Sequence, residues 1–368
     1  MRKLSIFFIT LISILISFVA CNNSVDDVFD NKPENTPLTL EFIDAGNVTL
    51  TKEGNPGEIY YSLDLGNTTT IAPFDTPISV PAGGKISFYR NLDHGFDDDE
   101  YDYFTINCDK DCYIYGNVMS LISKEGFGKA NKVFKYALNN LFKGNTHIKN
   151  HNSIDLVLPA TELAYWCYGN MFEGCKGLKK TPKLPATKLV PYCYYYMFYK
   201  CTTLEDISAI SATELDDSCC LGMFAGCTGL KTVPEDLLSA TKMNVGHCYR
   251  SMFAGCTSLI KAPALPATEL AEYCYTFMFE NCTSLETAPV LPAESLKNAC
   301  YYDMFAGCSS LQSITCLAKT YESTLFGCLH YWLENVAGSG TFYRSPNVPD
   351  SFWTSDIPYS GWTIQVAQ

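Results

Sequence analysis

Basic side chains are scarce in this sequence. Lys and Arg number 26 against 39 Asp and Glu, which gives a formal charge of −13, and no run of basic residues is longer than two. A protein that binds nucleic acid must bring positive charge to the phosphates, so we exclude nucleic acid as a partner. The surplus of negative charge favours solubility outside the cell.

The sequence also lacks the short motifs of common catalytic sites. A Gly-rich phosphate loop, a nucleophile elbow and a His-Glu-x-x-His zinc motif are all absent. The five His residues are scattered and lie in no recognisable acid–base or nucleophile pattern. We therefore expect a protein that is not an enzyme and that uses no cofactor.

One acidic loop is a candidate for metal binding. Asp97–Glu100, with Asp93 and Asp102 nearby, offers the hard oxygen ligands that calcium prefers. The loop lacks the EF-hand pattern and its Gly, so we favour a solvated acidic loop over a calcium site. The repeat cysteines, described below, have no His partners and do not match a closed zinc site. We predict no metal site.

The N-terminal residues have the layout of an export signal. Arg2 and Lys3 precede an apolar stretch, Leu4–Val19, that is short for a membrane-spanning helix and is followed by no polybasic stop. An uncleaved anchor helix is the alternative. The small residue before Cys21 resembles the lipobox of bacterial lipoproteins, which implies that Cys21 is acylated and becomes the mature N-terminus. The following Asn22–Asp27 resembles the signal for the outer face of a Gram-negative outer membrane, which implies a lipid-anchored protein facing the cell exterior.

A sequence repeat covers half of the chain. Met-Phe recurs six times at spacings of 26, 26, 29, 26 and 26 residues, beginning at Met171 and ending at Phe305. Each Met-Phe is followed by a Cys three residues after the Phe, and a second Cys lies eight residues before that one. The earlier column is Cys167, Cys193, Cys219, Cys248, Cys274 and Cys300, and the later column is Cys175, Cys201, Cys227, Cys256, Cys282 and Cys308. Fixed spacing of this kind indicates stacked coils, each packing its apolar side against its neighbours.

The repeat also predicts a turn in every coil. The residue before the later Cys is Gly in four units and Asn in one, which suggests a positive φ, and Lys200 departs from this pattern. A degenerate unit upstream, Leu141–Ile148, has Asn145 in place of the later Cys. We therefore expect this column to hydrogen-bond the turn backbone.

The motif Met-Phe-x-Gly-Cys-x-x-Leu, which follows Leu-Pro-Ala-Thr-x-Leu in most units, resembles the BspA-type leucine-rich repeat surface proteins. The resemblance spans roughly residues 136–330. It implies a right-handed solenoid with a short parallel sheet, and attachment to host proteins or other cells.

Two columns raise questions of chemistry. Buried, reduced Cys ladders are favoured over disulfides, because eight helical residues would hold the two Cys of a unit too far apart for a bridge. Disulfides remain the alternative, because Ala137 and Asn145 replace both Cys of the degenerate unit together, as a lost disulfide would also produce. The residue after the earlier Cys is usually Tyr, namely Tyr168, Tyr194, Tyr249, Tyr275 and Tyr301. These tyrosines either pack between coils, the favoured alternative, or form the best candidate for an exposed ligand-binding stripe.

The regions on either side of the repeat differ from it. Short alternating runs such as Leu38–Phe42 and Lys85–Tyr89, separated by Gly, Pro and Asn, predict an all-β sandwich. Cys108–Cys112 is expected on a hairpin between two of its strands, where an oxidised pair is plausible in an exported protein. The C-terminal residues, with Trp332, Trp353 and Trp362, are expected to form a capping hairpin.

The fold class is therefore an α/β repeat: a leucine-rich-repeat solenoid of 26-residue coils preceded by a small all-β sandwich. Residues 1–20 form the signal peptide, 21–37 a linker, 38–123 the β domain, 124–330 a solenoid of about seven units and 331–368 the cap. We expect a monomeric surface lipoprotein that adheres to host or other cells through protein or glycan ligands. The alternative is a glycan-capture accessory of a polysaccharide uptake system.

Overall fold

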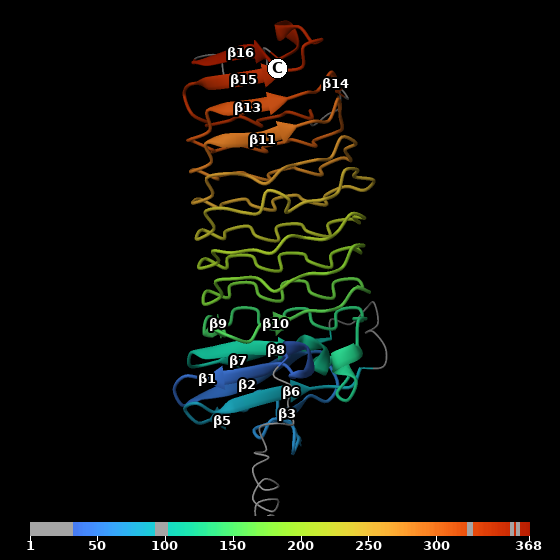
Figure 1. Ribbon diagram of the computed structural model, residues 1–368, viewed down its shortest axis with the longest axis vertical. Coiled ribbons are helices and arrows are strands. Elements are labelled where there is room, and N and C mark those ends of the chain that lie inside the picture. Colours follow the sequence, from blue (N-terminus) through green and yellow to red (C-terminus); the bar gives the residue numbers. More distant parts are fainter. Residues whose placement is uncertain (1–31, 93–101, 322–326, 354–356, 358–360) are drawn as a thin grey trace, which may run out of the picture.

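The computed structural model describes residues 32–92, 102–321, 327–353, 357 and 361–368. A stack of coils rests on a β domain formed by the N-terminal part of the chain (Figure 1). Two of the sequence hypotheses, acylation at Cys21 and calcium at Asp97–Glu100, fall on positions outside the described residues. No described helix is long and apolar enough to cross a membrane.

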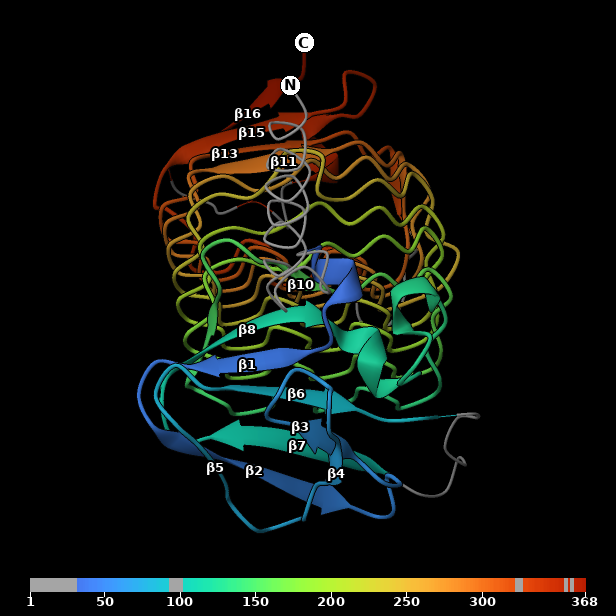
Figure 2. The same ribbon diagram turned by 60° about the horizontal axis from the view of Figure 1, so that its bottom comes forward.

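The β domain consists of two antiparallel sheets whose apolar side chains share one core, to which Leu40, Leu50 and Ile106 belong. The larger sheet contains β1 (Thr39–Phe42), β3 (Tyr60–Ser62), β4 (Thr70–Ile71), β6 (Lys85–Tyr89) and β8 (Cys112–Asn117). The smaller sheet contains β2 (Gly46–Glu53), β5 (Ile78–Val80) and β7 (Tyr103–Cys108), as Figure 2 shows. The alternating runs therefore form strands where the sequence suggested them.

The hairpin expected at Cys108–Cys112 is wrong. Strand β7 pairs with β2, whereas β8 pairs with β1, so the turn between them joins the two sheets. Both thiols are reduced in the structure, with their Sγ atoms 3.6 Å apart. Alternation of apolar residues shows that two segments are strands, but it does not show which neighbour each one pairs with.

The solenoid continues directly from the β domain. Two short strands of the first coil, β9 (Ile148–Asn150) and β10 (Leu156–Val157), pair in parallel with β8. On the other side of the coil, Ile106 N of β7 donates to Leu141 O at 2.7 Å. The β domain thus covers the end of the repeat stack, which would otherwise present unpaired backbone groups.

The side of the coils that carries the strands, which we call the strand-bearing side, has little continuous sheet. Among the described coils, a parallel sheet of several coils forms near the C-terminal end, from β11 (Thr287–Leu291), β13 (Ser313–Cys316), β15 (Gly340–Arg344) and β16 (Trp362–Val366), with β12 (Ser295–Leu296) and β14 (Thr320–Tyr321) paired beside it. The earlier coils meet through isolated bridges such as Leu184 with Ile210. Pro residues recur here, at 182, 234, 263 and 289, and Pro cannot donate to a ladder.

The capping hairpin expected for residues 331–368 is also wrong. Strands β15 and β16 pair in parallel and extend the order β11-β13-β15-β16, so this segment adds further turns of the solenoid. The side chains of Trp332 and Trp353 are buried there. Because the sequence of this segment diverges from the repeat motif, the motif alone did not show that the solenoid continues into it.

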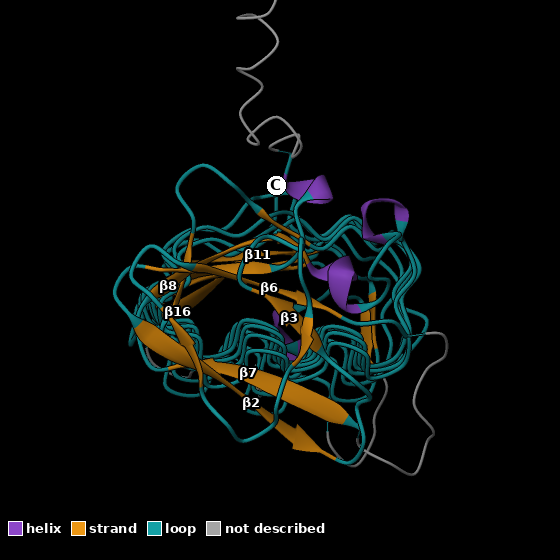
Figure 3. Ribbon diagram, turned by 90° about the horizontal axis from the view of Figure 1, so that it is seen from below, coloured by secondary structure: helices purple, strands orange, loops and turns teal. Residues whose placement is uncertain are grey.

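The helical half of the predicted α/β repeat is replaced by turns. The described helices are four short 3-10 segments, η2 (Pro33–Asn35), η3 (Val118–Leu121), η4 (Phe127–Lys129) and η5 (Asp350–Phe352). Opposite the strands, the segment from two residues before the earlier Cys to the later Cys has a positive φ at every fourth residue, for example Trp166 (55°), Asn170 (54°) and Gly174 (73°). We call this part of every coil the turn side; Figure 3 shows it as loop along the stack.

Backbone hydrogen bonds explain how the turn side is held. Successive N–H groups alternate between two kinds of acceptor. Cys167 N donates to Ala164 O within its own coil at 3.1 Å, and Tyr168 N donates to Cys193 O of the next coil at 3.1 Å. The backbone groups are therefore paired without a helix, as buried polar groups require.

The positive φ predicted for the residue before the later Cys is present, and it extends to Lys200, which departs from the Gly and Asn pattern. Gly226 and Gly255 have φ of 72° and 73°, and Asn281 has 58°. Lys200, which has a Cβ, is held at 57° in the same column. Contacts with neighbouring coils therefore impose the left-handed conformation even where the side chain disfavours it.

Candidate functional site

The tyrosines proposed from sequence as binding residues are not accessible. Tyr168, Tyr194, Tyr249, Tyr275 and Tyr301 are each 1% exposed. Their rings stack from coil to coil, with centroids 6.1 Å apart for Tyr168 and Tyr194 and 6.0 Å for Tyr275 and Tyr301. The binding stripe at these positions is therefore wrong, and the column packs the core.

The two Cys columns are also buried, and their thiols are free in the structure. Each later Cys directs its Sγ to the backbone oxygen of a Phe in the preceding coil, at 3.1 Å for Cys175 and Phe142 and 3.0 Å for Cys308 and Phe279. Asn145 takes the same place in the first coil and donates from Nδ2 to Ile106 O at 3.0 Å. This column therefore hydrogen-bonds backbone, and burial raises the pKa of its thiols, to about 12 for Cys256.

The accessible aromatic residues lie in other columns of the turn side. A group that we call the aromatic cluster spans the coils from the degenerate unit to the second full unit. Its members are Tyr136, Tyr165, Trp166, Tyr192, Tyr195, Tyr196 and Tyr199. Trp166 is at its centre, 5.3 Å from Tyr192 in a stacked arrangement and 4.6 Å from Tyr195, measured between ring centroids.

The aromatic cluster is open to solvent except at Tyr136, which is buried with 7% exposed. Tyr165 is 36% exposed, and Trp166, Tyr195 and Tyr199 are half-buried. A repeat-based reading misses these residues because their columns vary: the position of Tyr195 holds Gly169 one coil earlier. The signal available in the sequence was the local density of aromatic residues after Tyr192.

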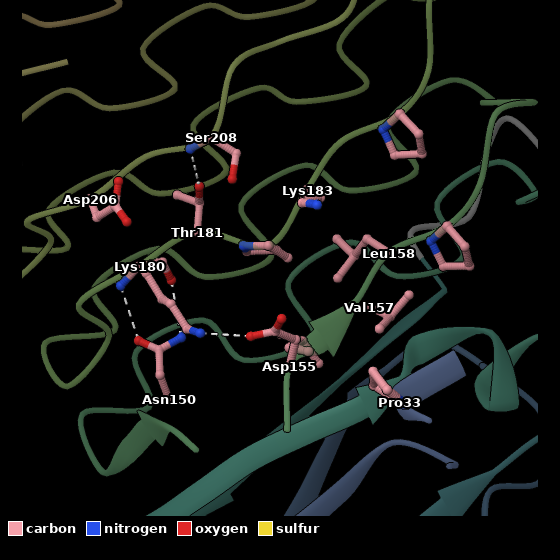
Figure 4. Close-up of a pocket in the computed structure, with 14 residues that line it drawn as sticks. Pro33, Asn150, Asp155, Val157, Leu158, Lys180, Thr181, Lys183, Asp206 and Ser208 are labelled. Atoms are coloured by element: carbon pink, nitrogen blue, oxygen red, sulfur yellow. Dashed lines mark hydrogen bonds and ion pairs between the residues drawn. The ribbon is translucent and has the colours of Figure 1, made fainter. Parts of the chain in front are cut away.

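The strand-bearing side has a hollow of about 500 Å³ near the β domain (Figure 4). Several of its polar side chains are already paired. Lys180 Nζ contacts Asp155 Oδ1 at 2.6 Å, and Asn150 Oδ1 accepts from the backbone of Lys179 and Lys180. No group of three or more potential metal ligands occurs among the described residues. The other charged side chains of the lining are those of Lys183 and Asp206.

Exposed ion pairs follow the same side along the stack. They join Lys to Glu of an adjacent coil, at 3.6 Å for Lys188 and Glu214 and 2.5 Å for Lys242 and Glu269. All four side chains are at least 60% exposed. Such pairs contribute little to stability and leave a surface of alternating charge.

Comparison with known proteins adds one finding to this geometry. The sequence profile described as BspA type Leucine rich repeat region matches the chain in six copies, over residues 149–275 and 240–336. No curated protein and no solved structure matches this chain.

Proposed function

Because this chain belongs to the BspA-type leucine-rich repeat family, we propose that it is a cell-surface binding protein whose contact surface is the turn side of the solenoid. The family consists of repeat proteins that bind partners and is not a known enzyme family. Stacked coils present an extended surface, which suits a large partner such as a protein or a polysaccharide. Adhesion to host or other cells is the role we assign to it.

The observation that carries this proposal is the aromatic cluster. Tyr and Trp offer a large rigid contact area with a polar tip and lose little side-chain entropy on binding. The solvent-exposed edge of Tyr165, next to Trp166 and Tyr195, supplies such an area across adjacent coils. Residues of this kind are the usual anchors of a binding surface.

The experiment is a double substitution, Tyr165→Ser with Tyr195→Ser. Neither residue has a positive φ, so the turn backbone should tolerate the change. Attachment of the purified protein to cultured cells should fall at least tenfold, as expected when anchor residues are truncated. Ile260→Ser is the matched control, since Ile260 is 46% exposed and lies outside the aromatic cluster. Equal attachment by the double variant and the control would reject the turn side as the binding surface.

We propose further that the protein is anchored by a lipid at Cys21 in the outer membrane and faces the exterior. The support is the sequence around Cys21, a charged start and a short apolar run that end in a small residue before the cysteine. Cys21→Ala should abolish incorporation of a palmitate analogue in the producing cells. Continued labelling of that variant would contradict lipidation at this residue.

A further inference from the structure

One pair of cysteines differs from the other described cysteines of this chain. Cys108, at the end of β7, and Cys112, at the start of β8, flank the turn that joins the two sheets of the β domain, and their Sγ atoms are 3.6 Å apart. Cys108 is half-buried, whereas every other described cysteine is buried. A disulfide needs a sulfur–sulfur separation of about 2 Å, so a small rotation of the two side chains brings these atoms within bonding distance.

The hydrogen bonds of this pair distinguish the two thiols. Cys112 donates from its thiol to Cys108 Sγ, and Asn145 Nδ2 donates to the same sulfur at 3.4 Å. The hydrogen bond from Cys112, with a smaller contribution from Asn145, lowers the pKa of Cys108, although burial opposes this shift. The hydrogen bond to Cys108, together with burial, raises the pKa of Cys112. Because the thiolate is the nucleophile in exchange with a disulfide, Cys108 is the more reactive of the two.

The turn between the two cysteines is held on both sides. Asp109 accepts from Asn47 of β2, at 2.6 Å from the backbone N and 2.8 Å from Nδ2. Asp111 contacts His147 Nδ1 at 3.0 Å and Lys149 Nζ at 2.5 Å, and both of these residues belong to the first coil. The two thiols are therefore held side by side before any bond forms, so bond formation costs little chain entropy.

The repeat cysteines lack this combination of contact and exposure. Burial raises the pKa of Cys167 and Cys274 to about 12, so these thiols stay protonated at neutral pH. Cys219 also contacts other thiols, those of Cys220 and Cys248, but all three are fully buried. A dissolved oxidant cannot reach a thiol that has no exposed surface.

We propose that Cys108 and Cys112 form a redox-active pair that exchanges with small-molecule disulfides. The Cys108 sulfur attacks one sulfur of the small disulfide and forms a mixed disulfide, and the thiolate that leaves takes up the proton lost by Cys108. Cys112 then loses its proton and attacks the Cys108 sulfur, and the second small thiol leaves with that proton. The pair loses two electrons to the small disulfide, which is reduced to two thiols. The new bond closes the turn between the two sheets, beside the first coil.

The test treats folded, fully reduced protein with oxidised glutathione, blocks the remaining thiols with N-ethylmaleimide in denaturant and maps the peptides by mass spectrometry. Trypsin cleaves after Lys110, between the two cysteines, so the expected bond joins two tryptic peptides that a reductant separates. The repeat cysteines should carry N-ethylmaleimide to the same extent as in untreated protein. Absence of the bond between Cys108 and Cys112, or disulfides that form as readily among the repeat cysteines, would overturn the inference.

Single variants separate the roles of the two thiols. Cys112→Ser should stop at the mixed disulfide and retain one glutathione on Cys108. Cys108→Ser should retain roughly tenfold less glutathione, because Cys112 is buried and its pKa is raised. Equal labelling of the two variants would contradict the assignment of Cys108 as the nucleophile.

Cys175→Ser is the matched control. Serine can also donate to Phe142 O, so this variant should fold and should form the bond between Cys108 and Cys112 as the wild type does. Loss of that bond in the control would mean that the repeat cysteines take part in the oxidation, which overturns the pair as an independent site.

A thermal melt checks that the fold is arranged for the bond. The oxidised wild type should melt at a higher temperature than the reduced protein, because the bond restricts the unfolded chain. Cys108→Ser should melt at the same temperature with and without oxidised glutathione. An oxidised wild type that melts at or below the temperature of the reduced protein would show that the turn must distort to form the bond, and the inference would be wrong.

Discussion

The two sides of each coil are held together by different means, although one continuous chain forms both. On the turn side, every second backbone N–H donates to the next coil, as Phe172 N does to Met197 O at 2.9 Å. On the opposite side, the central coils meet through single bridges such as Leu184 with Ile210 and through exposed Lys–Glu pairs. The turn side is a continuous ladder, and the strand-bearing side is a set of separate contacts.

The side chains show the same difference. Phe residues stack through the whole turn side, with centroid separations between 5.3 Å for Phe172 and Phe198 and 5.8 Å for Phe142 and Phe172. On the strand-bearing side, Val290 is 53% exposed. The comparison teaches that the turn side contributes more to stability, because it adds a continuous hydrogen-bond ladder to its buried apolar groups. The other side also buries apolar residues, such as Leu184 and Leu265 of the repeated Leu-Pro-Ala-Thr-x-Leu motif, but its coils share few backbone hydrogen bonds.

Alkaline pH should destabilise the turn side more than any of the substitutions described below. Burial raises the pKa of five turn-side thiols to about 12, namely Cys167, Cys201, Cys256, Cys274 and Cys308, and does the same for Cys316 of β13 on the opposite side. A thiol whose pKa is higher in the folded state stabilises the fold below the unfolded pKa, near 9, and that contribution is lost as the pH rises toward 12. We expect the free energy of unfolding, measured with urea under reducing conditions, to fall by more than about 5 kcal/mol between pH 8 and pH 11.

The control for this prediction is the state of the thiols. Unfolded protein that has not been reduced should react with a maleimide at most of the repeat cysteines. Complete protection until a reductant is added would establish disulfides and remove the physical basis of the alkaline effect.

Truncation of one stacked ring should have the next largest effect. Phe253 is fully buried between Phe224 and Phe279, at centroid distances of 5.7 Å from each. Phe253→Ala should lower the free energy of unfolding by about 3–5 kcal/mol, because it removes a buried ring and leaves a cavity. Val290→Ala on the opposite side should change it by less than about 0.5 kcal/mol. Similar losses for both variants would mean that the two sides contribute equally.

A smaller effect should come from the strained turn at Lys200. Its φ of 57° suits Gly, which occupies the same column in Gly226 and Gly255. Lys200→Gly should therefore stabilise the protein by about 1 kcal/mol. Lys183→Gly, at an exposed position without a positive φ, is the matched control and should destabilise slightly through the greater freedom of the unfolded chain. Loss of stability in Lys200→Gly would show that the lysine side chain itself holds the turn.

The smallest effect should come from an ion pair on the strand-bearing side. Lys188 and Glu214 are 71% and 69% exposed, so solvent screens their attraction. Lys188→Gln should change the free energy of unfolding by less than about 0.5 kcal/mol, with little dependence on salt concentration. A larger, salt-sensitive loss would give this side a stabilising role that its geometry does not indicate.

The sequence predicted those features that repeat strictly. Identical residues at a fixed spacing occupy the same environment in every coil, so the buried Phe column and the turn before the later Cys could be anticipated from the pattern alone. The hydrogen-bonding role of the later Cys column followed from one substitution, Asn145, since Asn and Cys can both donate to a backbone oxygen.

Other features could not be inferred because residue type did not specify them. Tyrosine suits both a binding surface and a packed core, and the burial of Tyr194 depends on how the coils stack. Positive φ at Tyr192 and Tyr273 is imposed by hydrogen bonds to the adjacent coil, so no glycine signal marked these turns. The spacing set the period of the coil, but the helix expected in the α/β repeat is wrong, because hydrogen bonds between coils hold that segment as turns.

By itself, the sequence determined that the chain is built of stacked repeats, that the Phe column faces the core and that a turn precedes the later Cys. The tertiary structure alone decided where ligands can reach. The aromatic cluster joins columns that differ from coil to coil, with the ring of Trp166 in one coil 4.6 Å from that of Tyr195 in the next. Contacts of this kind depend on how two distant parts of the chain pack together, and a repeating pattern holds no record of them because they occur only once.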